Sequence, residues 1–136
     1  MRNVSLHDLL ELRLAIETAA LVRAAQAPIA EQLEEARAAI VTMENPGVTQ
    51  AAFLEADVAF HAALVAASGN EALRLVILAV KDSIRAHLDE TLRGRAFAKI
   101  RPRVLDEHRK LLAAVEGGHV KTVSALLRAH LEFYGT

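Results

Sequence analysis

The sequence predicts an all-α fold, a bundle of antiparallel helices. Apolar residues recur at helical rather than alternating spacing along almost the whole chain. Ala and Leu, both strong helix formers, dominate, and runs of β-branched residues bounded by turn residues do not appear. With 53% hydrophobic and 24% charged residues the chain is not of the disordered class, and 136 residues suit one domain with one core.

The first two helices are predicted at about residues 5–25 and 28–44. Ser5, followed three residues later by Asp8, resembles a capping box, in which a side chain accepts a hydrogen bond from the first turn. Pro28 suits the first turn of the second helix, because the N–H that proline lacks has no helical partner there. Asn45-Pro46-Gly47 then forms a turn, since the residue before a proline avoids the helical conformation.

The third and fourth helices are predicted at about residues 49–67 and 71–92. Thr49 can cap the third helix with its hydroxyl group. Ser68-Gly69-Asn70 closes it, because glycine readily adopts the left-handed conformation that ends helices. Such short loops favour antiparallel packing of the helices that they join.

The last two helices are predicted to run to Val115 and over residues 120–134. Gly94 breaks or bends the chain after the fourth helix, and Pro102 is compatible with the N-terminal turn of the fifth. Gly117-Gly118 ends the fifth helix. We see no internal repeat and no linker that would divide the chain.

Polar side chains interrupt the apolar stripes of three predicted helices. Asp57 and His61 are four residues apart, so both project from the same face of the third helix, one turn from each other. Their stripe also contains Phe53, Phe60 and Leu64. The fifth helix carries His108 among Leu105, Leu111, Leu112 and Val115, and the sixth carries His130 among Val123, Leu126, Leu127 and Tyr134.

A buried carboxylate is costly unless it is paired or coordinates a metal. One carboxylate and three imidazoles that converge in the core can hold a divalent cation, at about 2.0–2.2 Å from zinc, with positions left for water or an exogenous carboxylate. The alternative stays open that each histidine is a core residue with one satisfied hydrogen bond, and that Asp57 and His61 form a simple pair. Residue types alone do not choose among zinc, nickel, manganese and iron.

Three segments in this order resemble the FCD domain, the C-terminal effector-binding domain of the FadR-type branch of GntR transcription regulators. They are LELRLAIETAA from Leu10 to Ala20, the D-x-x-x-H-x-x-L segment at Asp57, His61 and Leu64 with Gly69-Asn70 after it, and EHRKLLAAVEGG with Glu107-His108 before a terminal His130-Leu131. The resemblance extends from about Leu6 to Phe133. It implies an antiparallel bundle of six or seven helices that forms a homodimer.

The resemblance also implies a metal and an effector. In metal-binding members of the family an Asp and three His hold zinc, nickel or a similar ion, and the matching residues here are Asp57, His61, His108 and His130. The effector is a small organic acid whose carboxylate lies near the metal. Arg13 in the opening helix is the residue that helps to bind it, because a guanidinium holds a carboxylate with two hydrogen bonds. Alternatively, Arg13 forms a surface pair of little energy with Glu17.

Other histidines have plainer interpretations. His87 follows Val80 and Ile84 at i+7 and i+3 spacing, so His87, with Ser83 on the same helix, is a further candidate for effector contact or else a packing residue. His7 and His119 are expected to be exposed to solvent. The basic stretch from Arg93 to Arg103 is expected to be a solvated loop.

Three functions are therefore weighed. The first is a metal-dependent sensor of an organic acid within a transcription regulator, without enzymatic activity of its own. The second is a stand-alone metalloenzyme with a metal-bound water, for which Glu17 is the one tempting general base. The third is a pure dimerisation module.

The setting expected for the protein is the cytoplasm, because the chain lacks Cys, a signal peptide and a membrane-length apolar run. A net charge of −1 offers no basic footprint for nucleic acid. Regulators of this family carry a winged helix-turn-helix domain before the FCD domain, and only a few residues precede the first predicted helix here. We therefore expect DNA contact only through an N-terminal domain outside this chain, which is either part of a longer protein or a stand-alone domain.

Overall fold

The computed structural model describes residues 4–93 and 95–135, except for the side chains of residues 134 and 135. These residues form six α-helices and no strand, which confirms the predicted all-α class. The helices are α1 (Leu6–Gln26), α2 (Ala30–Glu44), α3 (Gln50–Ala66), α4 (Glu71–Leu92), α5 (Phe97–Glu116) and α6 (Val120–Gly135). The predicted bend at Gly94 and the Tyr134 side chain lie outside the described residues.

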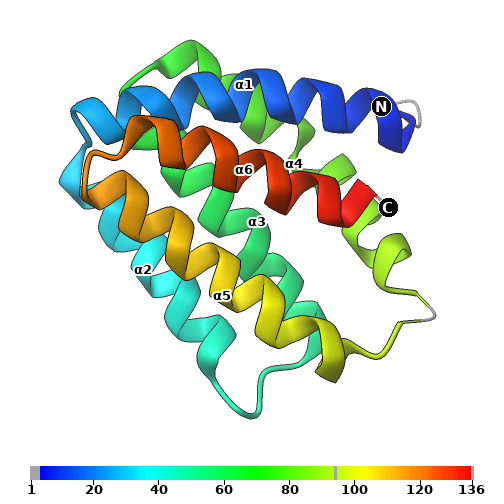
Figure 1. Cartoon of the computed structure of the whole chain (residues 1–136). Helices are drawn as coiled ribbons and strands as arrows, with labels where there is room; N and C mark the ends of the chain where they lie inside the picture. The colour runs from blue at the N-terminus through cyan, green and yellow to red at the C-terminus, as the bar shows by residue number, and fades with distance from the viewer. Residues whose placement is uncertain (1–3, 94, 136) are drawn as a thin grey trace.

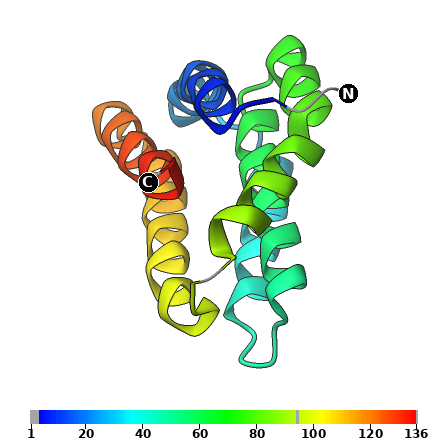
Figure 2. The ribbon, with the colours of Figure 1, turned by 90° about the vertical axis from the view of Figure 1, so that its right-hand side faces the viewer.

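The helices form an antiparallel bundle (Figure 1). Three pairs that are consecutive in the chain pack against each other, namely α2 with α3, α3 with α4, and α5 with α6. α1 lies antiparallel along α6, so the first turn of α1 and the last turn of α6 lie at the same end of the molecule (Figure 1). Seen from the side, α5 and α6 form one flank, α3 and α4 lie on the opposite flank, and α1 lies between them at the top (Figure 2).

α3 lies at the centre of this arrangement. It packs against α1, α2 and α4, and its buried residues surround most of its circumference, as expected for a helix enclosed by neighbours. Phe53, Leu54, Phe60 and Leu64 are almost fully buried. Phe53 also meets Phe97 of α5 edge to face, with ring centroids 5.2 Å apart. Polar residues on α3 are therefore placed in the middle of the core.

Side-chain caps start several helices as predicted. Ser5 accepts a hydrogen bond from the N–H of Asp8, and Thr49 accepts one from Ala52. Asn70 has a different role from the predicted one, because its side chain accepts the N–H of Leu73 at 3.0 Å and thus begins α4. Gly69 alone supplies the left-handed conformation after α3, with φ of +73°.

The two predicted proline positions need correction. Pro28 precedes the first turn of α2, because the next residue, Ile29, keeps an extended backbone and donates its N–H to the carbonyl of Ala67 at 3.0 Å. Pro102 lies in the second turn of α5, which costs one backbone hydrogen bond. Arg101 holds this first part of α5 in place, since its guanidinium donates at 2.8 Å to two carbonyls at the end of α2.

Charged residues recur along the longest helices. α4, with 22 residues, carries Arg74, Lys81, Asp82 and Arg85 among its apolar positions. In the part of the chain that the structure describes, no helix combines the length and the apolar character needed to cross a bilayer.

The cap at the start of α4 gives a test of the fold. Asn70→Ala should lower the free energy of unfolding by about 1 kcal/mol, because the N–H of Leu73 loses its acceptor. Asn70→Asp should retain most of the stability, since a carboxylate caps equally well. Chemical denaturation of both variants measures the difference, and equal losses would mean that the cap contributes nothing.

Candidate metal centre

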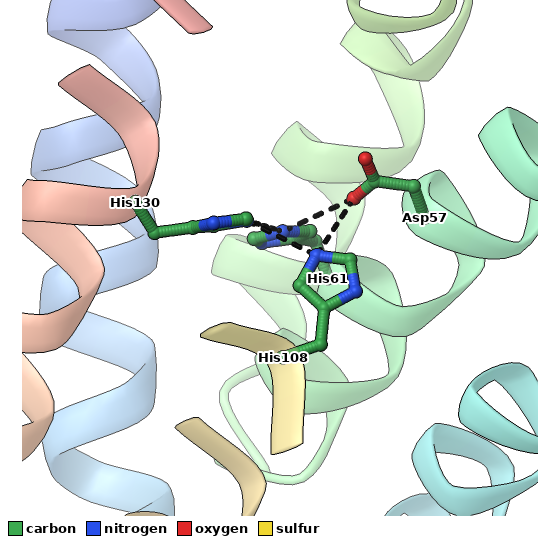
Figure 3. Close-up of side chains that lie close together, drawn as sticks. All are labelled: Asp57, His61, His108 and His130. Carbon is green, nitrogen blue, oxygen red and sulfur yellow. Dashed lines mark hydrogen bonds and ion pairs between the residues drawn. The ribbon is translucent and has the colours of Figure 1, made fainter. Parts of the chain in front are cut away.

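The four polar side chains predicted on apolar stripes converge inside the bundle (Figure 3). Asp57 and His61 come from α3, His108 from α5 and His130 from α6, and each is at most 2% exposed. One ligand atom from each residue lies within 4.8 Å of all the others. The predicted convergence is therefore observed, while ligation of an ion by these residues remains a proposal.

The separations between the inward-facing atoms suit one small cation. His130 Nε2 lies 3.1 Å from His61 Nε2 and 3.0 Å from His108 Nε2. Asp57 Oδ1 lies 3.1 Å from His108 Nε2 and 3.4 Å from His61 Nε2. Two ligands with bonds of about 2.1 Å lie about 3.0 Å apart at a right angle and about 3.4 Å apart at a tetrahedral angle. The donor set therefore fits a divalent ion that accepts nitrogen and oxygen.

Aromatic packing fixes the orientation of the imidazole rings. The His108 ring stacks on Phe60, with centroids 4.4 Å apart and an interplanar angle of 17°. The rings of His61 and His130 are nearly parallel, at 6°, with centroids 5.1 Å apart. Because buried rings packed in this way have little rotational freedom, the three Nε2 atoms stay directed at the same point.

A buried ion pair on α1 contacts the outer nitrogen, Nδ1, of His61. Nδ1–H of His61 donates to Glu17 Oε1 at 2.6 Å, and Arg13 Nε donates to Glu17 Oε2 at 2.6 Å. Glu17 is fully buried and Arg13 is 5% exposed. The predicted Arg13–Glu17 pair thus exists, but in the core rather than on the surface, and there it holds His61 in the tautomer whose Nε2 is free to bind a metal.

A second carboxylate supports His130 in the same way. Nδ1–H of His130 donates to Glu107 Oε1 at 2.6 Å, and Arg103 Nε donates to Glu107 Oε2 at 3.0 Å. The Arg103 guanidinium also lies over the ring of Phe133, 3.8 Å from its centroid. This chain of contacts is nearer the surface, because the Glu107 side chain is 21% exposed.

The third histidine, His108, has a weaker hydrogen-bond partner. His108 Nδ1 lies 3.2 Å from the thioether sulfur of Met43 on α2, which is a weak acceptor. All three histidines thus use Nδ1 outwards and present Nε2 inwards. Of the outer partners, the sequence indicated only Glu17, as a possible base. The Arg-x-x-x-Glu spacing at residues 13–17 and 103–107 does not identify either carboxylate, because the same spacing at Arg128 and Glu132 gives an exposed pair.

The pKa values of the buried groups depend on two effects, burial and neighbouring charges, and the balance between them differs from group to group. Burial alone would raise the pKa of Glu17, but the charges of Arg13 and His61 outweigh it and lower the value to about 2. Burial lowers the pKa of His130 to about 4 and also lowers that of His108. For His61 burial acts in the same direction, yet the Glu17 carboxylate prevails and raises its pKa.

The three residues predicted for effector contact lie around α1 and α4. Arg13 and His87 line a small cavity of about 20 Å³ between these helices, together with Leu6, Leu9, Leu10, Ile84, Leu88 and Thr91. Nε2–H of His87, which is half-buried, donates to the carbonyl of Val4 at 2.7 Å. Ser83 is half-buried one turn earlier on α4 and does not line this cavity. His7 and His119 are exposed, as predicted.

The class of the domain is shown by its similarity to known proteins. The chain matches the family model of the FCD domain over residues 8–133, and it therefore belongs to the FCD domain family. It is 29% identical over 133 residues to the HTH-type transcriptional regulator LutR of Bacillus subtilis (strain 168). The matched region covers 96% of this chain and 61% of LutR, so the chain spans about three-fifths of the length of that relative.

The outer carboxylates predict a measurable effect on metal binding. Glu107→Gln should weaken zinc or nickel binding about 10- to 100-fold, because the ring of His130 loses its charged acceptor. Glu116→Gln is a matched control on α5, since Glu116 pairs with Arg37 on the surface, away from the cluster. Competition titration with a chromophoric chelator measures both affinities, and equal affinities in the two variants would contradict a supporting role for Glu107.

The raised pKa of His61 predicts coupling between metal and proton binding. Zinc binding near neutral pH should release protons, because the ion and the proton compete for His61, whose pKa is raised by the Glu17 carboxylate. Apparent affinity should fall as the pH is lowered from 8 to 6, while His130, with a pKa of about 4, stays neutral throughout this window. Calorimetry in buffers of different ionisation enthalpy counts the protons, and a heat independent of the buffer would contradict the competition.

Proposed function

We propose that this chain is the effector-sensing domain of a GntR-type transcription regulator, and that it detects a small organic acid with the help of a divalent metal ion. Asp57, His61, His108 and His130 would hold the ion. The observation that supports this most directly is the buried four-donor cluster inside a domain of the FCD family. Zinc and nickel suit these donors, as do manganese and iron.

The donor set leaves room for a ligand. Three imidazole nitrogens and one carboxylate oxygen supply four donors, and an ion with five or six ligands accepts one or two more. A bound divalent ion supplies positive charge that attracts a carboxylate. The chain's own contribution is to fix the four donors, to exclude bulk water from them and to direct the three Nε2 atoms at one point.

Arg13 links the metal cluster to the cavity between α1 and α4. Its Nε–H is taken by Glu17, and a guanidinium has further N–H groups that can hold an effector carboxylate. The cavity of about 20 Å³ has room for about one water, so an organic acid would require α1 and α4 to separate. His87 would then release the Val4 carbonyl, and Ser83 would come within reach of the ligand. Effector binding would thus select a more open population of the domain.

This opening offers a route to regulation. The His87–Val4 hydrogen bond holds the start of α1 against α4. In a longer regulator a separate DNA-binding domain would precede α1, and a change in how α1 is held would alter its position. DNA contact, a homodimeric assembly and a cytoplasmic setting belong to this proposal.

Glu17, the candidate general base of the metalloenzyme alternative, is not available as a base. Both carboxylate oxygens of Glu17 are engaged, by His61 and Arg13, and its side chain is fully buried. A pKa of about 2 also makes Glu17 a weak proton acceptor. The geometry thus favours a supporting role for Glu17 over catalysis.

Thermal unfolding with a panel of small mono- and dicarboxylic acids tests the proposed function. In the zinc- or nickel-loaded protein, an acid at a hundred times its Kd should add about 2.7 kcal/mol of apparent stability. The same acid should give no shift in metal-stripped protein or in Asp57→Ala, which should lose the ion. Val41→Ala on the exposed surface of α2 is a control that should respond like the unaltered chain.

Two results would contradict the proposal. An equal shift in metal-stripped protein would mean that the ion takes no part in sensing. No shift with any acid of the panel, together with hydrolytic turnover by the metal-loaded protein, would favour the enzyme.

A further inference from the structure

We propose that the ion pair between Arg103 and Glu107 controls how a divalent cation enters and leaves the central cluster, and that His130 is the ligand that moves to let the cation pass. This inference rests on the proposed metal centre and adds a route to it. Such a route is needed because each of the four candidate ligands is at most 2% exposed. A hydrated cation cannot reach them unless some side chains move.

The cluster is closest to water on the side of His130. Glu17 and Met43, which contact the outer nitrogens of the other two histidines, are both fully buried. Glu107, which accepts the Nδ1–H of His130, has a side chain that is 21% exposed. Of these three outer partners, Glu107 alone reaches the surface. His130 also reaches the cluster from α6, on the side away from Asp57 (Figure 3).

Arg103 closes this side of the cluster. Its Nε–H donates to Glu107 Oε2 at 3.0 Å, while Oε1 of the same carboxylate accepts from His130 at 2.6 Å, so both oxygens are engaged. The Arg103 guanidinium lies over the ring of Phe133, yet its side chain is 56% exposed. Because an exposed ion pair is weak, Arg103 can rotate into water at little cost.

The backbone near this pair is held in place by other contacts. The Arg101 guanidinium donates at 2.8 Å to two carbonyls at the end of α2, and the ring of Phe97 packs edge to face on α3. The start of α5 is therefore attached to two other helices. Opening of the route then involves the side chains of Arg103, Glu107 and His130, without displacement of α5.

The charges of the pair favour entry only when it is open. In the closed pair, the positive charge of Arg103 repels an approaching cation. When Arg103 turns away, Oε2 of Glu107 becomes free to attract a hydrated cation at the surface. His130 can then shift together with Glu107, whereas His61 and His108 keep their buried outer partners. His130 is thus the ligand that binds last and dissociates first.

The rates of Co²⁺ uptake and removal by the full chain test this route. Co²⁺ accepts the same donors and absorbs visible light when bound, so its uptake and its removal by excess EDTA can be followed directly. Arg103→Met keeps an apolar stem over Phe133 but removes the charge and the N–H donors. It should accelerate both uptake and removal about five-fold, and Arg103→Gln should do the same. Arg103→Lys keeps a cation beside Glu107 and should stay close to the unaltered chain.

Arg128→Met is the matched control. Arg128 pairs with Glu132 four residues on, at 3.3 Å, and its side chain is 65% exposed, so the variant removes the same charge from a surface pair of α6. Both rates should stay unchanged in this variant, and circular dichroism confirms that each variant is folded.

Three results would overturn the proposal. Equal rates in Arg103→Met and Arg128→Met would mean that the Arg103–Glu107 pair does not control access. Faster uptake with unchanged removal would mean that Arg103 acts through its charge alone. Either result, in a chain that binds Co²⁺, would leave the metal centre in place and exclude only the route. A chain that binds no Co²⁺, Zn²⁺ or Ni²⁺ would overturn the route and the proposed metal centre together.

Discussion

An aspartate and three imidazoles at the centre of an apolar core form the constraint on which the rest of this structure depends. Each of these groups would cost several kcal/mol if it were buried without partners. Two sets of contacts offset this cost, one on the outer side of the histidine rings and one on their inner side. Outwardly, two of the three Nδ1 atoms face glutamates at 2.6 Å, each with an arginine behind it. Inwardly, the Nε2 atoms and the Asp57 carboxylate share one point, where a divalent cation would balance the remaining charge.

This constraint divides the helices by role. α1, α2, α3, α5 and α6 each contribute a ligand candidate or a residue that supports one. α4 contributes none of these, and it carries His87, Ser83 and the exposed side chains of Leu75 and Val76. Movement of α4 against α1 can therefore change the cavity beside Arg13 without breaking the central cluster. The proposed sensing function thus falls on the cavity between α4 and α1, beside the central cluster and not within it.

Helix positions and the four central residues could be predicted from sequence because periodicity reports burial. A carboxylate and three histidines on otherwise apolar stripes had to enter the core together. Two features depended on tertiary contacts that no local pattern contains. Pro102 lies inside α5 because Phe97 and Arg101 attach the preceding turn to α3 and α2. Glu17 supports His61, which is 44 positions away, and its burial came from packing of α1 rather than from its spacing to Arg13.

The most direct measurement is the anomalous scattering of crystals of the full chain, grown after the purified protein is loaded with one equivalent of zinc or nickel. The central claim requires a single strong peak at the absorption edge of that element, within about 2.0–2.2 Å of Asp57 Oδ1 and the three Nε2 atoms. A peak at another location, or none between these four side chains in crystals that contain the metal, would contradict it.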